Sequence, residues 1–231
     1  MRDSPASGAD APECPAHRAA VVLLQQAAAS LNRPVLVGIG GPGGSGKSTF
    51  ARSLDAHLDD VRVLPVDDYR KPRHERPRGI YGSHPEGNRL DLLRKHLDLA
   101  RRGEPFERPV FCRVSGAAPA GEIVLPARFI LAEGEITAHR ALRDAFDLRI
   151  LILADWSLQW RARMGRDRHE HGCGLRKALS VFVRSNLRDY PRFAAGARRD
   201  AHLVLRRGRS GGWRCVFCSN ETASLAPGRC G

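Results

Sequence analysis

The sequence lacks any long hydrophobic run. Among its 231 residues, no apolar stretch approaches the roughly 18 to 20 residues that a membrane-spanning helix requires, so no such helix is expected. Residues 1–17 also lack the apolar core of a secretion signal and are rich in Pro, Ala, Ser and Asp. We therefore expect a cytoplasmic protein whose residues 1–15 form a flexible tail.

Lysine is scarce. The chain has four lysines against a net charge of +13, so most of its positive charge is carried by arginine, whose planar guanidinium suits phosphate. The positive residues recur along the whole chain, and no interleaved aromatics mark a nucleic-acid module. A solvated surface with a phosphate-handling cleft is favoured over nucleic-acid binding, for which steeply salt-dependent binding would be the sign.

The cysteines show no disulfide framework. Cys215-x-x-Cys218 has the spacing of half a zinc site, but no histidine or second cysteine pair follows at a metal-site spacing. Reduced thiols are therefore expected. The six cysteines lie at positions 14, 112, 173, 215, 218 and 230.

One stretch carries a strong chemical signal. An apolar run beginning at Val35 leads into G-x-x-x-x-G-K-S over Gly41 to Ser48, and a helical pattern follows. Its glycines let main-chain N–H groups surround phosphate oxygens, Lys47 reaches the β- and γ-phosphates, and the Ser48 hydroxyl is suited to Mg²⁺. We predict a P-loop for ATP and Mg²⁺. The predicted cradle consists of Gly41, Pro42, Gly43, Gly44, Ser45, Gly46, Lys47, Ser48 and Thr49.

The rest of the chain alternates strand and helix patterns, which is typical of a single α/β domain. We predict a P-loop NTPase fold over residues 16–206, with a parallel sheet, helices on both faces, a nucleotide core from about residue 34 and a lid over 160–174. Residues 207–231 lose periodicity and are expected to be an irregular tail. Strands are expected at 35–39, 61–66, 109–114, 127–132, 148–154 and 201–205, and helices at 16–31, 47–58, 88–102, 136–146, 156–168 and 175–190.

Three acidic residues follow predicted strands. Ligands of a parallel sheet lie at the carboxyl ends of its strands, so Asp67 and the P-loop should face one cleft. There Asp67 could take the proton of an acceptor hydroxyl, with magnesium binding through water or a turn cap as its other roles, and Asp68 is the weaker candidate. Glu133 is a candidate magnesium ligand, although a helix cap or a salt bridge explains it equally well.

Two basic segments complete the predicted site. Arg163 and Arg166 lie three apart on one helical face, where they could close over phosphates and neutralise the transferring group. A solvated basic face is the alternative. Residues 70–87 are basic and rich in proline, which indicates a substrate loop.

Taken in order, these motifs resemble the phosphoribulokinase/uridine kinase family of P-loop small-molecule kinases, over residues 34–205. Besides the P-loop, the chain has Asp67-Asp68-Tyr69, Glu133-Gly134 and the lid-like Arg166-Asp167-x-x-Glu170-x-Gly172. The resemblance implies ATP-dependent phosphorylation of a hydroxyl on a sugar phosphate or nucleoside, with Asp67 as base. A homo-oligomer is compatible with it.

The departures from the family pattern concern the acceptor. Arg70 stands where the family has an aromatic or histidine, and the lid ends Glu170-His171-Gly172 where Glu-Arg-Gly is usual. The segment 109–116 lacks the expected tyrosine, acidic or amide residue, and histidine. The acceptor is therefore left open, and the alternative is a non-catalytic ATP-binding protein with a degenerate acceptor site.

Overall fold

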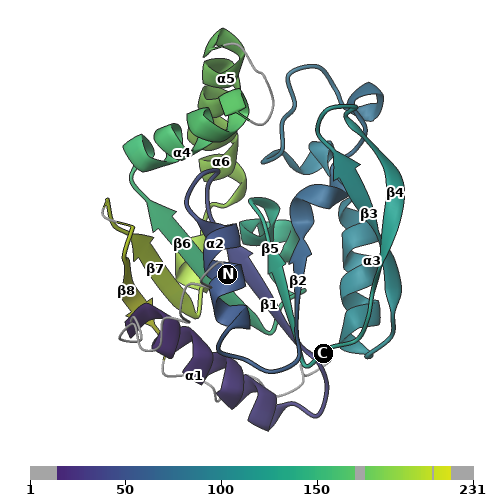
Figure 1. The fold of residues 1–231 in the computed structure, drawn as a ribbon, viewed down its shortest axis with the longest axis vertical. Coiled ribbons are helices and arrows are strands. Elements are labelled where there is room, and N and C mark those ends of the chain that lie inside the picture. The colour runs from purple at the N-terminus through teal and green to yellow at the C-terminus, as the bar shows by residue number, and fades with distance from the viewer. Residues whose placement is uncertain (1–14, 170–174, 210, 220–231) are drawn as a thin grey trace, which may run out of the picture.

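The computed structural model describes residues 15–169, 175–209 and 211–219, without the side chains of 166–169, 175 and 177. In this part of the chain, a six-stranded sheet has the order β2-β5-β1-β6-β7-β8 (Figure 1). All its pairs are parallel except β7 with β8. The strands are β1 (Val35–Gly40), β2 (Val61–Pro65), β5 (Phe129–Glu133), β6 (Leu148–Ala154), β7 (Leu203–Arg207) and β8 (Trp213–Cys218).

The strand order brings the predicted motifs to one edge. β5 lies between β1 and β2, so β2 is not the direct neighbour of the P-loop strand. The register nevertheless pairs Glu133 with Ile39 on one side and with Pro65 on the other. The carboxyl ends of β1, β5 and β2 are therefore level, and the loops that leave them share one end of the sheet.

Helices cover both faces of the sheet, as predicted. α1 and α2 bury Leu24 and Phe50 on one face, while α3 buries Leu93 on the other. β1 is buried along its whole length, as expected for a central parallel strand. No helix in the described ranges is long and apolar enough to cross a membrane. The helices are α1 (Pro15–Ser30), α2 (Lys47–Asp55), α3 (Leu90–Arg101), α4 (Trp156–His169), α5 (Leu175–Phe182), α6 (Tyr190–Phe193) and α7 (Ala197–Asp200).

The helix predicted over 136–146 is wrong. The chain forms two short 3₁₀ turns there, Ile136–Ala138 and Arg140–Leu142. The Thr137 hydroxyl donates to the Gly134 carbonyl over 2.9 Å, a local bond that competes with helix formation. Phe146 then packs against the sheet, and a side chain at Gly38 of β1 would collide with its ring. Close packing on the sheet therefore outweighs the helical propensity.

A separate hairpin forms beside α3. The extended segment predicted at 109–114 belongs to β3 (Phe106–Cys112), which pairs antiparallel with β4 (Ala117–Val124), a strand that the sequence did not indicate. Most of β4 is exposed, and its Ala, Gly and Pro content has low strand propensity. Buried Phe106 and Val124, which pair at the base of the hairpin, attach it to the core.

The predicted irregular tail is wrong over Trp213–Cys218. These residues form β8, an antiparallel edge strand that also packs against α1. Trp213 contacts Phe50 of α2 with ring centroids 5.2 Å apart, so the strand reaches the helix that follows the P-loop. Residues 1–14 of the predicted N-terminal tail and 220–231 of the C-terminal one lie outside the described residues.

Candidate active site

The P-loop joins β1 to the start of α2. Gly46 caps α2 with a φ of 96°, a left-handed conformation that favours glycine, and it supplies no side-chain cap. The first turn of α2 also contains no acidic residue. A side chain at Gly43 would collide with Arg163 and Glu135. The first N–H groups of α2 therefore have no side-chain cap and can bind an anion. The adjoining loop favours glycine at positions 43 and 46.

The side chains of the loop fit a polyphosphate. Lys47 is buried, and its Nζ donates to the Pro42 carbonyl over 2.9 Å, so its charge is held inside the loop. Ser45 is fully buried, and its Oγ has no hydrogen-bond partner among the described residues. An enclosed ammonium beside an unpaired hydroxyl matches the negative charge and the acceptor oxygens of phosphate.

The two predicted metal ligands lie together. Ser48 Oγ on α2 donates to Glu133 Oε1 at the end of β5 over 2.9 Å. A hydroxyl and a carboxylate are hard oxygen donors, which are the ligands that Mg²⁺ prefers. Thr49, the next predicted nucleotide contact, is exposed on the same helical turn. The pair fits a magnesium site at the mouth of the P-loop.

The two aspartates after β2 point to different partners. Asp67 Oδ2 accepts from Arg113 Nη2 over 2.7 Å and lies 2.8 Å from Arg70 Nη2. Asp68 instead pairs with Arg108 and accepts from the Phe111 N–H over 3.1 Å. Asp67 is thus held among arginines, whereas Asp68 ties β3 to the loop after β2.

Glu135 is a site residue that the sequence analysis missed. Its carboxylate is buried, accepts from Ser83 Oγ, accepts from Ser185 Oγ over 3.0 Å and lies 3.4 Å from Arg163 Nη1. Burial alone would raise its pKa, but the charges of Arg163 and Lys47 outweigh this effect and hold the pKa below its usual range. The only signal in the sequence was a second carboxylate just after Glu133.

The same carboxylate links the two halves of the site. Both Lys47 and Asp67 interact electrostatically with Glu135, Lys47 by attraction and Asp67 by repulsion. The register of β1, β5 and β2 also places the P-loop and the turn that carries Asp67 at level strand ends, at the same end of the sheet. The structure therefore brings Lys47, Ser48, Asp67 and Glu133 to one end of the molecule.

The predicted lid helix lies against the P-loop. Arg163 Nη1 of α4 donates to Asn186 Oδ1 over 2.6 Å, and Asn186 Nδ2 donates to the Gly43 carbonyl over 2.8 Å and to Gln159 Oε1 over 2.9 Å. Asn186 belongs to a π-helical turn, Val183–Asp189, between α5 and α6, at the P-loop end of the sheet (Figure 1). Arg163 is thus beside the loop, while the side chain of Arg166 and residues 170–174 lie outside the described part.

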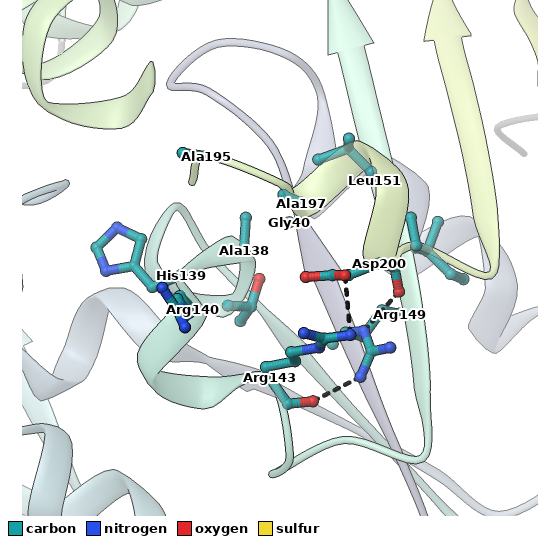
Figure 2. Close-up of a pocket in the computed structure, with 14 residues that line it drawn as sticks. Gly40, Ala138, His139, Arg140, Arg143, Arg149, Leu151, Ala195, Ala197 and Asp200 are labelled. Carbon is teal, nitrogen blue, oxygen red and sulfur yellow. Dashed lines mark hydrogen bonds and ion pairs between the residues drawn. The ribbon is translucent and has the colours of Figure 1, made fainter. Parts of the chain in front are cut away.

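A second hollow lies against β1 on the α3 face of the sheet. Arg149 Nε donates to the Asp200 carbonyl over 2.7 Å and its Nη1 to the Arg143 carbonyl over 2.5 Å (Figure 2). The free space is about 20 Å³, enough for roughly one water molecule. Burial lowers the pKa of His139 in its wall to about 4. This hollow is too small for a metabolite.

Comparisons with known proteins agree with this geometry. The sequence profile described as "Phosphoribulokinase / Uridine kinase family" matches residues 36–211. A uridine kinase of Alkaliphilus metalliredigens is 28% identical over 187 residues, which are 77% of this chain and 89% of that protein. A uridine kinase of Geobacillus sp. is 29% identical over 185 residues, or 76% and 87% of the two chains. The structure of D-glycerate 3-kinase from Cryptococcus neoformans superposes with a TM-score of 0.62 at 12% identity, over 86% of this chain and 98% of that one.

These matches cover the P-loop, the two aspartates, Glu133 and the α4 helix, so they confirm the resemblance inferred from the motifs. They also confirm the predicted P-loop fold with its single α/β domain. The chain belongs to the phosphoribulokinase/uridine kinase family and is an ATP-dependent P-loop kinase that phosphorylates a hydroxyl group.

Proposed function

We propose that this kinase phosphorylates a hydroxyl of a small metabolite, a sugar phosphate or a nucleoside, with Asp67 as the general base. The observation that carries the proposal is the strand register: Glu133 at the end of β5 pairs with Ile39 of β1 and with Pro65 of β2, so the P-loop and Asp67 follow level strand ends. A phosphate bound by the P-loop and a hydroxyl at Asp67 would therefore meet at the carboxyl end of the sheet.

Each remaining residue has a role in this assignment. Ser48 and Glu133 would hold Mg²⁺, which neutralises charge on the phosphates when it is bound. Lys47 would bind the β- and γ-phosphates in exchange for the Pro42 carbonyl. Arg163 and Arg166 of α4 would face the transferring group and exclude water from it.

The chemical step uses few protein groups. The acceptor O–H proton passes to the Asp67 carboxylate while the hydroxyl oxygen bonds to the γ-phosphorus. The bond from the γ-phosphorus to the oxygen that bridges it to the β-phosphorus breaks, and ADP leaves. Asp67 Oδ2 now accepts from Arg113, so an acceptor hydroxyl that approaches this oxygen would displace or reorient the arginine.

An acceptor screen that follows ADP release tests the assignment. With ATP and magnesium, ADP should form only with certain members of a panel of sugars, sugar phosphates and nucleosides. Asp67→Asn should lower kcat about 10²- to 10⁴-fold, the usual contribution of a general base, while calorimetry finds the affinity for ATP nearly unchanged. Normal turnover by this variant would remove Asp67 from the base role. ATP binding without ADP release for every acceptor would contradict a kinase.

A further inference from the structure

Arg70 and Arg113 pair with the candidate base, and Arg73 and Arg76 lie beside these two arginines; we call the four the acceptor-side cluster. Arg70, Arg73 and Arg76 belong to the loop that follows β2, and Arg113 belongs to the turn of the β3–β4 hairpin beside that loop (Figure 1). Arg73 Nη2 donates to the Arg113 carbonyl over 2.7 Å, which holds the two segments together. The cluster therefore lies where the acceptor would enter.

The cluster gathers like charges. Arg70 and Arg113 pair with the same carboxylate, that of Asp67, and Arg73 donates to a neutral carbonyl. Arg76 stacks over the Phe111 ring at 5.7 Å and forms no ion pair with a described carboxylate. Burial, together with the charges of its two arginine neighbours in the loop, lowers the pKa of Arg76. An anion bound beside Arg76 would relieve this repulsion.

Hydrogen-bond donors in the cluster are also unsatisfied. The Nε atoms of Arg70 and Arg76 are buried, and neither has a hydrogen-bond partner among the described residues. A buried donor without a partner costs about 1–3 kcal/mol, more for a charged group, so such donors point to a ligand that completes them. Guanidinium groups are matched by the paired oxygens of phosphate or carboxylate.

Resting on the proposed function, we propose that the acceptor carries an anionic oxygen group, which Arg76 and Arg113 bind while its hydroxyl lies at Asp67. Arg113 is one-third exposed and shares its guanidinium with the base. If it turns to the anion of the acceptor, Asp67 Oδ2 keeps Arg70 as a partner and gains room for the hydroxyl proton. The anion therefore both anchors the acceptor and frees the base. Neutral nucleosides and sugars lack the group that drives this exchange.

Matched acceptor pairs test the proposal. ADP release is measured with three acceptors that share one carbon skeleton. The first is a neutral polyol, the second carries a carboxylate at one end, and the third carries a phosphate ester at that end. One of the two anionic members should exceed its neutral partner in kcat/KM by about tenfold to a hundredfold, the equivalent of one charge-assisted contact. The better of the two identifies the anion. Equal or faster turnover of neutral members would overturn the proposal and leave the kinase assignment intact.

Variants locate the effect. Arg76→Gln should raise KM for the anionic acceptor about tenfold and leave KM for ATP and turnover of the neutral partner unchanged. Arg94→Gln is the matched control, because Arg94 lies on α3, outside the cluster, and pairs with Asp144. Arg113→Gln should also remove the difference in kcat between the two acceptors. Melting curves verify that each variant is folded. An unchanged KM in folded Arg76→Gln would contradict the assignment.

A binding experiment separates this inference from the kinase assignment. With the P-loop filled by a non-hydrolysable ATP analogue, inorganic phosphate is titrated into wild type and Arg76→Gln by calorimetry. Binding by wild type that the variant loses supports the anion site even if no acceptor in the panel releases ADP. Equal binding by both proteins, or none by either, overturns it even if ADP is released.

Discussion

The two ends of the site recognise charge by different means. At the P-loop, Gly43, Gly46 and the start of α2 present main-chain groups, and Lys47 is buried within the loop. Around Asp67, recognition depends on long arginine side chains, of which Arg113 is one-third exposed. The first surface is formed by consecutive residues, whereas the second is assembled from separate segments of the chain.

This difference explains why nucleotide and acceptor specificity are separable in the chain. A cradle of backbone N–H groups accepts few substitutions, since any side chain at Gly43 would collide with its neighbours. Guanidinium groups at the acceptor end are placed by loops that tolerate change. The buried Glu135, which interacts with Lys47 and Asp67, is the point of contact between the two ends. Four predictions test this division.

The largest effect is expected from Lys47→Ala. Removing the enclosed ammonium should lower kcat/KM for ATP by about 10²- to 10³-fold, as loss of one aligned charged donor does, while KM for the acceptor changes little. Steady-state kinetics with each substrate varied in turn measures both. Lys95→Ala, which changes an exposed lysine of α3, is the control. A comparable rise in the acceptor KM would show that the two ends are not separable.

The second prediction concerns the clamp between the lid and the P-loop. Asn186→Ala removes the hydrogen bonds that Asn186 makes to the Gly43 carbonyl and Gln159 Oε1 and accepts from Arg163 Nη1, so we expect the free energy of unfolding to fall by about 1–3 kcal/mol. Asn186→Asp keeps the acceptor for Arg163 but turns a carboxylate oxygen toward the Gly43 carbonyl and Gln159 Oε1, two further acceptors, and should cost at least as much. Urea denaturation compares the three proteins. Equal stability of Asn186→Ala and wild type would mean that α4 does not depend on this residue.

The third prediction concerns His139, which lies close enough to Glu135 for the two charges to interact. Burial chiefly lowers the pKa of His139 from 6.5 to about 4, so the folded state holds the ring neutral while the unfolded state takes up a proton. Its contribution to stability is present above pH 6.5 and is lost as the pH falls towards 4. The free energy of unfolding should be about 2 kcal/mol smaller at pH 5 than at pH 7 from this residue.

Urea titrations at both pH values check the sign. His139→Leu should flatten the pH dependence, whereas His74→Gln, which removes an exposed ring, should not. The half-buried His202, whose pKa is also lowered by burial, contributes to the remaining slope. An identical slope in wild type and His139→Leu would place the proton uptake elsewhere.

The sequence predicted the P-loop end almost completely. Gly41 to Ser48 are consecutive, so their spacing alone specifies the local geometry, and the Ser48–Glu133 contact followed from two strand ends in one sheet. Glu135 and Asn186 were missed because their roles depend on contacts between groups that lie 23 to 143 positions apart in the chain. The periodicity of the sequence does not show which distant side chains come into contact. The sequence showed that the segment after β2 is rich in arginine, but not that these arginines lie together with Arg113 in the fold.

The edge of the sheet shows a second limit. The residues of β8 were predicted to belong to an irregular tail because the chain loses periodicity from Arg206 on. Pairing with β7 supplies the hydrogen bonds that the pattern does not indicate. The family match ends at residue 211, so this strand lies beyond the part of the chain that the family comparison covers.

The smallest expected effect tests whether this added strand assists the P-loop end. The Trp213 ring contacts Phe50, and a side chain at Gly46 would meet both this ring and Arg207, whose guanidinium lies 5.7 Å from the ring centroid. Trp213→Ala should therefore loosen the end of the loop and weaken ATP binding about threefold to tenfold, the equivalent of one aromatic or cation–π contact. Trp213→Phe retains a ring against Phe50 and should lose less.

Calorimetry measures the dissociation constants, with Phe217→Ala, an exposed change on the same strand, as control. If Trp213→Ala binds ATP as wild type does while its unfolding midpoint falls, β8 stabilises the sheet edge alone. In that case β8, which lies outside the family match, would have no role in nucleotide binding.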